Sequence, residues 1–393
     1  MNDNMTFDFR TIADSIDFGY GTNYREEHTV MAGAQLHVKT APCVIDALTR
    51  FVRTGLYGWT ASDDELYLRK TTEWMRRVRN FRIRSDWIVP SYGILQAMCT
   101  SIRAFTESGD GVIIQQPVYL LYAKAIVNCG RRIVDNGLTI AKGVYRMDFS
   151  DLEEKMSCSN NKLMLLCNPH NPIMDVWDRE DLLRIAALAK KHNVLVVADE
   201  IFAEHVPAPG QMTPYGNLAD ARDNCIVCTS LGKAFNFTGT GHSNIIIPDA
   251  DIRKTYIKQR DADHYGSLNP FMRTALLAAY SEDGKAWIDA LLDLGRRNQA
   301  LVETFLEETA PEARICRHRA GTLLWIDYRA SGIDERKLEN VLRAAGVEAD
   351  LGSKYGLNGT GFLRIQIGIP RHELERALER LRRVIEMETA ARR

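Results

Sequence analysis

Apolar runs and amphipathic stretches alternate through the middle of the chain. Three segments open with continuous apolar runs and end in polar or proline-rich turns, which predicts buried strands in residues 111–119, 163–172 and 194–200. Residues 178–193 have the period of a helix, with one apolar face made of Leu182, Ile185, Ala186 and Ala189. Asp178 can cap the start of this helix, and Asn193 follows as a stop. Strands that alternate with helices indicate an α/β domain with a largely parallel sheet.

The pattern changes past residue 280. Residues 323–329 and 362–369 alternate in the manner of strands. Residues 370–388 have the pattern of an amphipathic helix, with an inward face made of Leu374, Ala377, Leu378, Leu381 and Ile385. This mixture indicates a smaller α+β domain that the N-terminal segment completes. We therefore predict a large domain of residues 45–280 and a small domain of residues 1–44 with 281–393.

Composition narrows the class of protein. The chain has 393 residues, 45% hydrophobic and 26% charged, and its net charge of −1 gives no strong field for nucleic acid or an anionic membrane. The N-terminus lacks the pattern of a secretory signal, and no apolar run approaches bilayer length. Eight scattered cysteines make no disulfide framework, and the lone pair Cys225 and Cys228 has no second pair at zinc-site spacing. We expect a cytoplasmic protein without a metal site.

Unusual polar residues stand where three predicted strands end. Asn171 follows the second strand, and Asp199 and Glu200 end the third. Ser230 and Lys233 follow a further short apolar run, within "CTSLGKAFNFTGTG", where small residues and glycines surround the lysine. In parallel sheets, ligands bind beyond the carboxyl ends of the strands. The sequence therefore predicts a site at this edge.

The pairing of Lys233 with Asp199 fits one cofactor chemistry. A lysine amine can form a Schiff base with an aldehyde cofactor, and pyridoxal phosphate is the common one. Its pyridine nitrogen needs an anionic partner to stay protonated, which Asp199 can provide. Asn171 could hydrogen-bond the ring hydroxyl, and Tyr119 could lie against the ring face.

The phosphate of such a cofactor needs amide donors at a helix N-terminus. The segment "PSYGILQAMCTSI" supplies them, because Gly93 permits close approach and Ile94 and Leu95 open a helix. Ser230 could add a hydroxyl. These four residues are our candidate phosphate contacts.

Longer motifs resemble a known superfamily. "LCNPHNPIMDVWDREDLLRIAALAKKHNVLVVADEIF" with "TSLGKAFNFTGTG" resembles the fold-type I pyridoxal-phosphate enzymes of the class I/II aminotransferase superfamily. With "AFTESGDGVIIQQPVY", "YRMDFSDLEEK" and "GTGFLRIQIGIPR", it is most similar to the cystathionine β-lyase (C–S lyase) branch. The resemblance implies a large α/β domain whose mostly parallel central sheet is flanked by helices, and a smaller α+β domain.

The resemblance also implies roles for individual residues. Lys233 would carry the Schiff base and later shuttle a proton, while Asp199 pairs with the pyridine nitrogen. Asn171 would contact the ring oxygen and Tyr119 would stack on the ring. Arg364 would clamp the α-carboxylate of the substrate with a two-pronged hydrogen bond.

A homodimer is implied as well, in which a neighbouring subunit completes each site. Trp59, where the branch has a tyrosine, or Tyr57 would enter the neighbour's site. His37 and Lys39 stand where the branch has a recognisable pocket-lining segment. We therefore add Trp59 and His37 to Arg364 as candidate substrate-binding residues.

Three further positions depart from the branch. Phe202 stands where histidine is usual, Gly232 where serine is usual, and Met174 where glycine is usual. These departures leave the cofactor residues in place and change the pocket around them.

The sequence thus predicts a pyridoxal-phosphate enzyme that cleaves a carbon–sulfur bond. Its substrate would be a cysteine S-conjugate or a cystathionine-like amino acid, and α,β-elimination would release a thiol, pyruvate and ammonia. Transamination is the alternative, as is decarboxylation or oxidative deamination of an S-conjugated amino acid in a specialised pathway. The alternative hypothesis outside the enzyme class is a non-catalytic descendant that only binds the cofactor or a partner. The substrate side chain and the metabolic pathway stay open.

Overall fold

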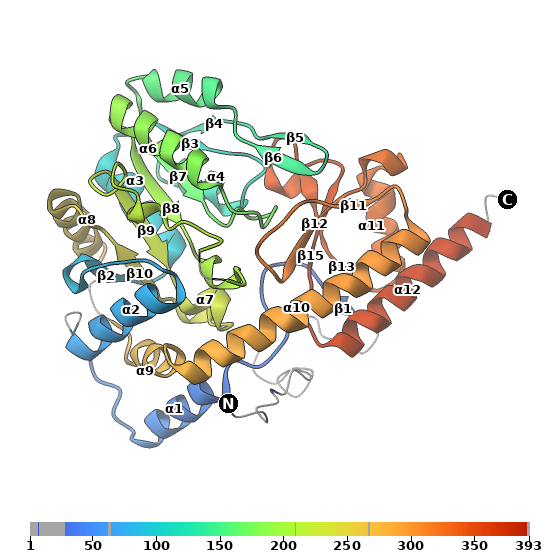
Figure 1. The fold of residues 1–393 in the computed structure, drawn as a ribbon, viewed down its shortest axis with the longest axis horizontal. Coiled ribbons are helices and arrows are strands. Elements are labelled where there is room, and N and C mark those ends of the chain that lie inside the picture. Colours follow the sequence, from blue (N-terminus) through green and yellow to red (C-terminus); the bar gives the residue numbers. More distant parts are fainter. Residues whose placement is uncertain (1–6, 8–27, 62–63, 209, 266–267, 391–393) are drawn as a thin grey trace.

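A seven-stranded sheet forms the core of the larger part of the chain (Figure 1). The computed structural model describes residues 7, 28–61, 64–208, 210–265 and 268–390. In spatial order the strands are β2 (Ile88–Ser91), β10 (Ser243–Ile246), β9 (Cys225–Thr229), β8 (Leu195–Asp199), β7 (Asn161–Cys167), β3 (Gly111–Ile114) and β4 (Arg132–Asp135). Only β10 runs against its two neighbours, so the sheet is mostly parallel, as predicted.

Helices cover both faces of this sheet, which explains why its central strands are continuous apolar runs. Val112 and Ile114 of β3 pack in one cluster with α3 (Ile94–Phe105), α4 (Leu121–Asn128) and α8 (Ala250–Ala262). The intervening Ile113 packs on the opposite side. That side is covered by α1 (Pro42–Arg53), α2 (Glu65–Val78), α5 (Phe149–Ser157), α6 (Arg179–His192) and α9 (Pro270–Ala279).

A second, antiparallel sheet organises the C-terminal part. Its order is β11 (Arg314–Ile315), β12 (Leu323–Asp327), β15 (Phe362–Gln366) and β14 (Asp350–Leu351), with α11 (Glu335–Ala344) and α12 (Arg371–Ala390) packed nearby. The N-terminal strand β1 (Thr29–Val30) pairs with β13 (Val347–Glu348) of this part. The long helix α10 (Glu282–Thr309) runs from the larger part to the smaller one (Figure 1). The domain boundaries themselves stay a prediction.

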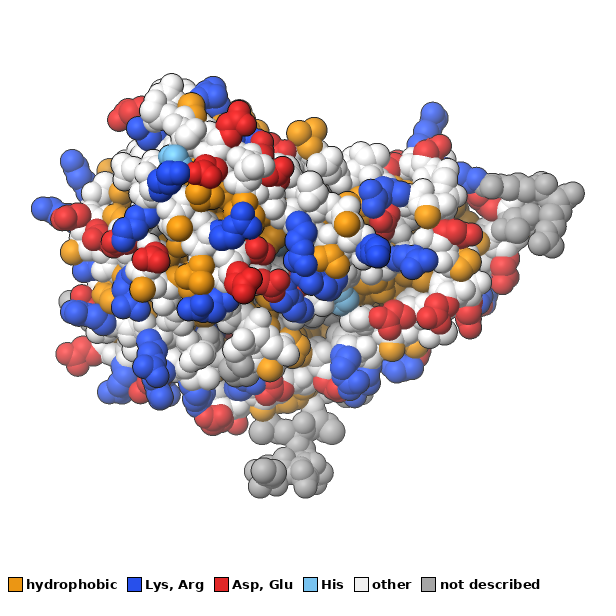
Figure 2. Space-filling model, turned by 45° about the horizontal axis from the view of Figure 1, so that its top comes forward, with side chains coloured by type: hydrophobic (Ala, Val, Ile, Leu, Met, Phe, Trp, Pro, Cys, Tyr) orange, Lys and Arg blue, Asp and Glu red, His pale blue; other side chains and the backbone are white. Residues whose placement is uncertain are grey.

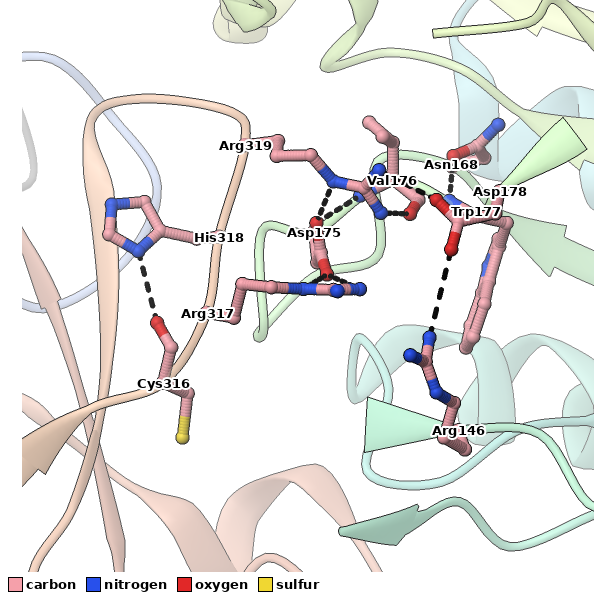
Figure 3. Close-up of polar contacts among 10 residues, drawn as sticks. All are labelled: Arg146, Asn168, Asp175, Val176, Trp177, Asp178, Cys316, Arg317, His318 and Arg319. Atoms are coloured by element: carbon pink, nitrogen blue, oxygen red, sulfur yellow. Dashed lines mark hydrogen bonds and ion pairs between the residues drawn. The ribbon is translucent and has the colours of Figure 1, made fainter. Parts of the chain in front are cut away.

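Two acids and two arginines join the two parts outside the sheets (Figure 3). Asp175 pairs with Arg317 at 2.7 Å and also with Arg319. Arg319 Nη1 donates to Asp178 Oδ1 at 2.7 Å, and Arg146 lies 3.7 Å from the same carboxylate. We call Asp175, Asp178, Arg317 and Arg319 the domain-bridging cluster. It ties the loop after β7 to the segment before β12.

Local predictions were confirmed except where tertiary contacts intervened. Helix α6 ends at Asn193, which takes the left-handed conformation with φ 54°. Asp178 lies at the start of α6, but its side chain makes no cap hydrogen bond, so its predicted capping role is wrong. Arg319 occupies the carboxylate instead. Lys233, expected in a turn, lies in the one-turn helix α7 (Leu231–Ala234).

The surface agrees with the near-zero net charge. Figure 2 shows lysine and arginine side chains interspersed with aspartate and glutamate, without a broad patch of one sign on that face. Among the described residues, every helix is too short or too polar to cross a lipid bilayer.

Candidate active site

A cavity of about 610 Å³ lies at the carboxyl ends of β7, β8 and β9. Its wall comes from both parts of the chain. Nine of the predicted residues line it: Gly93, Ile94, Leu95, Tyr119, Asn171, Asp199, Ser230, Lys233 and Arg364. Among these nine residues the chain brings together positions up to 271 apart, from Gly93 to Arg364.

Lys233 presents a buried amine to this cavity. It lies in α7, directly after β9, and its Nζ donates to the carbonyl oxygen of Ala34 at 3.0 Å. Burial and, to a smaller extent, the positive charge of Arg364 lower the pKa of Lys233, and the charge of Asp199 opposes both, so that the pKa is about 8. The amine is therefore easier to deprotonate than an ordinary lysine, which suits a nucleophile or a base.

Asp199 ends β8 as a buried carboxylate. The hydroxyl of Tyr122 donates to Oδ2 at 2.8 Å, and the amide of Ile201 donates to Oδ1 at 3.1 Å. Burial raises the pKa of Asp199 to about 6, against these hydrogen bonds and the charge of Lys233. A buried carboxylate of this kind gains from a cationic partner, and a protonated ring nitrogen in the cavity would be one.

Arg364 is held between two oxygen acceptors. Its Nη1 donates to Asn171 Oδ1 at 2.8 Å and its Nη2 to Asp350 Oδ2 at 2.6 Å. The guanidinium carbon lies 4.9 Å from the centre of the Tyr355 ring. Because Asn171 gives its oxygen to Arg364, its amide hydrogens are the groups left for a ligand.

The predicted phosphate end of the cavity has a free helix terminus. Helix α3 begins at Ile94, after Gly93 in a backbone conformation with φ 156° that other residues rarely adopt. The first amides of a helix have no partners within it, and its first turn here carries no acid. Ser230 lines the same end, but its hydroxyl already donates to the carbonyl of His242 at 2.6 Å.

Tyr119 lines the cavity next to Tyr122, with ring centres 6.1 Å apart in an edge-on arrangement. Burial raises the pKa of its hydroxyl, and the charge of Asp199 adds to this effect. The phenol therefore stays protonated at neutral pH. Its stacking role stays a prediction.

Trp59 and His37 do not line the cavity of Lys233. Trp59 is 90% exposed and lines a neighbouring cavity of about 440 Å³ with Tyr57. The two cavities share Tyr92, Gly241 and His242. His37 is buried elsewhere, and its amide donates to the carbonyl of Gly368 at 3.0 Å. Substrate binding by Trp59 and His37 stays a prediction.

Two departures noted in the sequence pack together. Phe202 lines the cavity, and Met174 lies behind it in a buried cluster with Ala320 and Leu323. Met174 has the left-handed backbone, φ 60°, that usually favours glycine. Its carbonyl accepts hydrogen bonds from the amides of Arg319 and Ala320, which holds this conformation.

Sequence reasoning missed Tyr122, Asp350 and the carbonyl of Ala34, which hydrogen-bond to Asp199, Arg364 and Lys233 respectively. Tyr122 had a local signal, because it stands three positions after Tyr119. Asp350 and the carbonyl of Ala34 had none. Asp350 meets Arg364 only because β14 pairs with β15 in that register.

Comparison with known proteins agrees with this geometry. Residues 30–381 match the family of aminotransferases of class I and II. Cystathionine beta-lyase PatB of Bacillus subtilis is 34% identical over 355 residues, which cover 89% of this chain and 90% of PatB. Protein MalY of Escherichia coli is 29% identical over 86% of this chain and 87% of its own.

A solved structure is similar over nearly the whole chain. Cystalysin from Treponema denticola, whose crystal structure contains pyridoxal 5'-phosphate, superposes with a TM-score of 0.91 at 32% identity, covering 98% of this chain and all of cystalysin. Sequence, fold and cavity lead to one assignment: the chain belongs to the aminotransferase class I and II family, in the fold-type I architecture.

Proposed function

We propose that this protein is a pyridoxal-phosphate-dependent C–S β-lyase that acts on a cysteine S-conjugate or a cystathionine-like amino acid. The observation that carries the proposal is that Lys233, Asp199 and Arg364 line one mostly apolar cavity. The names of PatB and the cofactor content of cystalysin support the same activity.

The residues of the cavity fit the cofactor. Lys233 would bind its aldehyde carbon, Asp199 its ring nitrogen and Asn171 its ring oxygen. The amides that open α3 would hold its phosphate, and Tyr119 would cover its ring. When bound, the cofactor supplies an electron-accepting ring that stabilises negative charge at the substrate Cα.

The chain's own residues then handle the substrate. Arg364 binds the α-carboxylate and fixes the orientation of the Cα–H bond. The amine of Lys233, released when the substrate amine takes its place at the aldehyde carbon and favoured as a free base by its lowered pKa, would take the proton from Cα. The electron pair left at Cα forms a second bond to Cβ as the Cβ–S bond breaks, and sulfur leaves as a thiolate with the electron pair of the broken Cβ–S bond. Hydrolysis of the remaining fragment gives pyruvate and ammonia.

The charges around the cavity favour this class over transamination of acidic amino acids. Among the described lining residues, Lys233 and Arg364 are the lysines and arginines, and both have roles at the reacting end. A side-chain carboxylate would therefore find no further cation. The remaining wall is rich in apolar groups that suit a thioether: Leu95, Leu120, Ile201, Phe202 and Phe237.

Product analysis tests the proposal. The purified, cofactor-loaded protein is incubated with a panel of cysteine S-conjugates, cystathionine and ordinary amino acids, with and without a keto acid, and products are identified by mass spectrometry. Equimolar pyruvate, ammonia and thiol without a keto acid would support elimination. Amino transfer that requires a stoichiometric keto acid would overturn the lyase proposal and support an aminotransferase instead.

We also propose that the enzyme is a homodimer. Exposed aromatic residues line the second cavity, which adjoins the first: Tyr57, Trp59, Tyr92 and Tyr265, with Phe271 packed against Tyr57. A contiguous apolar surface of this kind is typical of a protein interface. Light scattering measures the mass, and mixing Trp59→Ala with Lys233→Ala tests shared sites. A fully active monomer would overturn this proposal.

A cytoplasmic location completes the proposal. All eight cysteines are free thiols in the structure, as expected for a reducing compartment. Fractionation of the native host, with antibody detection of the protein, measures the location directly.

A further inference from the structure

An acid lies against the arginine that we assign to the substrate carboxylate. Asp350 Oδ2 accepts from Arg364 Nη2 at 2.6 Å and from the amide of Gly33 at 2.7 Å. Both side chains are buried, with 11% of Asp350 and 4% of Arg364 exposed, and both line the Lys233 cavity. The pair is therefore part of the cavity wall and not a surface ion pair.

The charge of Asp350 is fixed by its neighbours. Burial alone would raise its pKa, but the charge of Arg364, the Gly33 amide and Lys354, 3.5 Å away, together lower it. Asp350 is therefore ionised at neutral pH. It cancels much of the positive charge that Arg364 offers to an incoming anion.

Arg364 nevertheless keeps donors for a ligand. A guanidinium has five N–H groups, and the hydrogen bonds to Asn171 and Asp350 occupy one each. Its Nε is buried without a hydrogen-bond partner among the described residues. A carboxylate can thus bind Arg364 while Asp350 stays in place, so that two anions contact one guanidinium.

We propose that Asp350 tunes the carboxylate subsite by limiting the affinity of Arg364 for the carboxylate that it binds. The inference rests on the proposed role of Arg364 and deepens it. Two anions a few ångströms apart repel, so each carboxylate that enters is held less tightly than Arg364 alone would hold it. The same repulsion assists the release of pyruvate, which carries the carboxylate of the substrate.

Asp350→Asn is the sharpest test. The carboxamide oxygen can still accept from Gly33 and Arg364, so the geometry is kept and the charge is removed. Binding of propionate to the cofactor-loaded protein is measured by calorimetry, and we expect the variant to bind it at least about tenfold more tightly than the wild type. Propionamide, which is uncharged, should bind equally to both. Unchanged or weaker propionate binding would overturn the proposal.

Further variants keep the result interpretable. Asp350→Ser removes the charge with a smaller side chain and should show the same gain. Asp178→Asn removes an acid of the domain-bridging cluster outside the cavity and should leave propionate binding unchanged. If neither Asp350 variant melts cooperatively with the cofactor bound, the residue is a structural support and the proposal is wrong.

One more variant separates this inference from the proposed function. Arg364→Leu should abolish propionate binding; if it does not, the assigned role of Arg364 fails before that of Asp350 is reached. Product analysis of the wild type is independent of all these binding data. A lyase with no gain in Asp350→Asn would refute only the inference drawn here.

Discussion

The loop after β7 contributes to two groups of arginine contacts that differ in burial and in hydrogen bonding. Asn171 contacts Arg364 inside the cavity, and Asp175, four positions on, contacts Arg317 and Arg319 in the domain-bridging cluster (Figure 3). The Arg364 side chain is 4% exposed, whereas those of Arg319 and Arg317 are 31% and 37% exposed. Both groups join the larger part of the chain to the smaller one.

The difference lies in the donors that remain. Arg319 uses all three nitrogens within the protein, on Asp175, Asp178 and the carbonyl of Val176. Arg364 leaves its Nε without a protein partner and shares a cavity with Lys233. A partly exposed arginine whose three nitrogens all have protein partners serves to join two segments of the chain. A buried arginine with a nitrogen that lacks a protein partner can still bind a ligand.

The largest expected effect separates the two arginines by activity. Arg364→Leu should lower kcat/KM by about two to three orders of magnitude, because loss of a buried charged hydrogen bond removes several kcal/mol of binding. Arg319→Leu, the matched control, should stay within about fivefold of the wild type. Steady-state elimination assays measure both. Equal losses of kcat/KM in the two variants would contradict the distinction between a ligand-binding Arg364 and a structural Arg319.

The next effect concerns the cost, in protein stability, of burying the Lys233 amine in the cavity. Burial lowers the pKa of Lys233 from 10.5 to about 8, so the unfolded chain binds more protons between these values, and stability rises with pH across that window. Below pH 8 the full penalty, on the order of 3 kcal/mol, acts on the cofactor-free protein.

Lys233→Met should therefore make the cofactor-free protein more stable at pH 7, and the difference should vanish above pH 10.5. Urea unfolding at several pH values measures it. A variant less stable than the wild type at pH 7 would mean that the amine is well paired and not penalised. Lys191→Met, a surface lysine paired with Glu153, is the control and should show no such gain.

Much of the fold and of the cavity follows from local sequence signals. The helices α6 and α12 have helical hydrophobic periodicity, and the buried strands are continuous apolar runs. Asn171, Asp199 and Lys233 each stand at or after the end of such a strand. Because parallel strands end at one edge, their convergence could be predicted.

What the sequence did not predict depends on tertiary pairing. Asp350 reaches Arg364 through the register of β14 on β15, which no local pattern encodes. Asp178 has the position of a helix cap, but its carboxylate accepts a hydrogen bond from the partly exposed Arg319 instead. Trp59 is exposed on this single chain, so its substrate-binding role stays a prediction.

The domain-bridging cluster should matter for stability more than for activity. Asp175→Asn removes the negative charge and one of the two acceptor oxygens that Arg317 and Arg319 share. We expect the free energy of unfolding to fall by about 2 kcal/mol, since the Asp175 side chain is only 11% exposed. Elimination activity at 25 °C should stay within about twofold. A large loss of activity with unchanged stability would mean that the domain-bridging cluster belongs to the active site.

Salt gives the smallest effect and the finest separation of the two groups. Raising the ionic strength from 0.1 M to 1 M shortens the screening length from about 10 Å to about 3 Å, which weakens pairs that solvent can reach. The stability difference between wild type and Asp175→Asn should shrink by about 0.5 kcal/mol, because Arg317 and Arg319 are partly exposed. The ratio of propionate affinities between wild type and Asp350→Asn should change less, because the Arg364–Asp350 pair is more deeply buried and salt screens it less. Unfolding and calorimetric titrations at both ionic strengths measure the two quantities, with Asp178→Asn as the control for the titrations. If the propionate ratio fell as steeply as the stability difference, Asp350 would face solvent like the cluster does, and burial would not distinguish the two arginines.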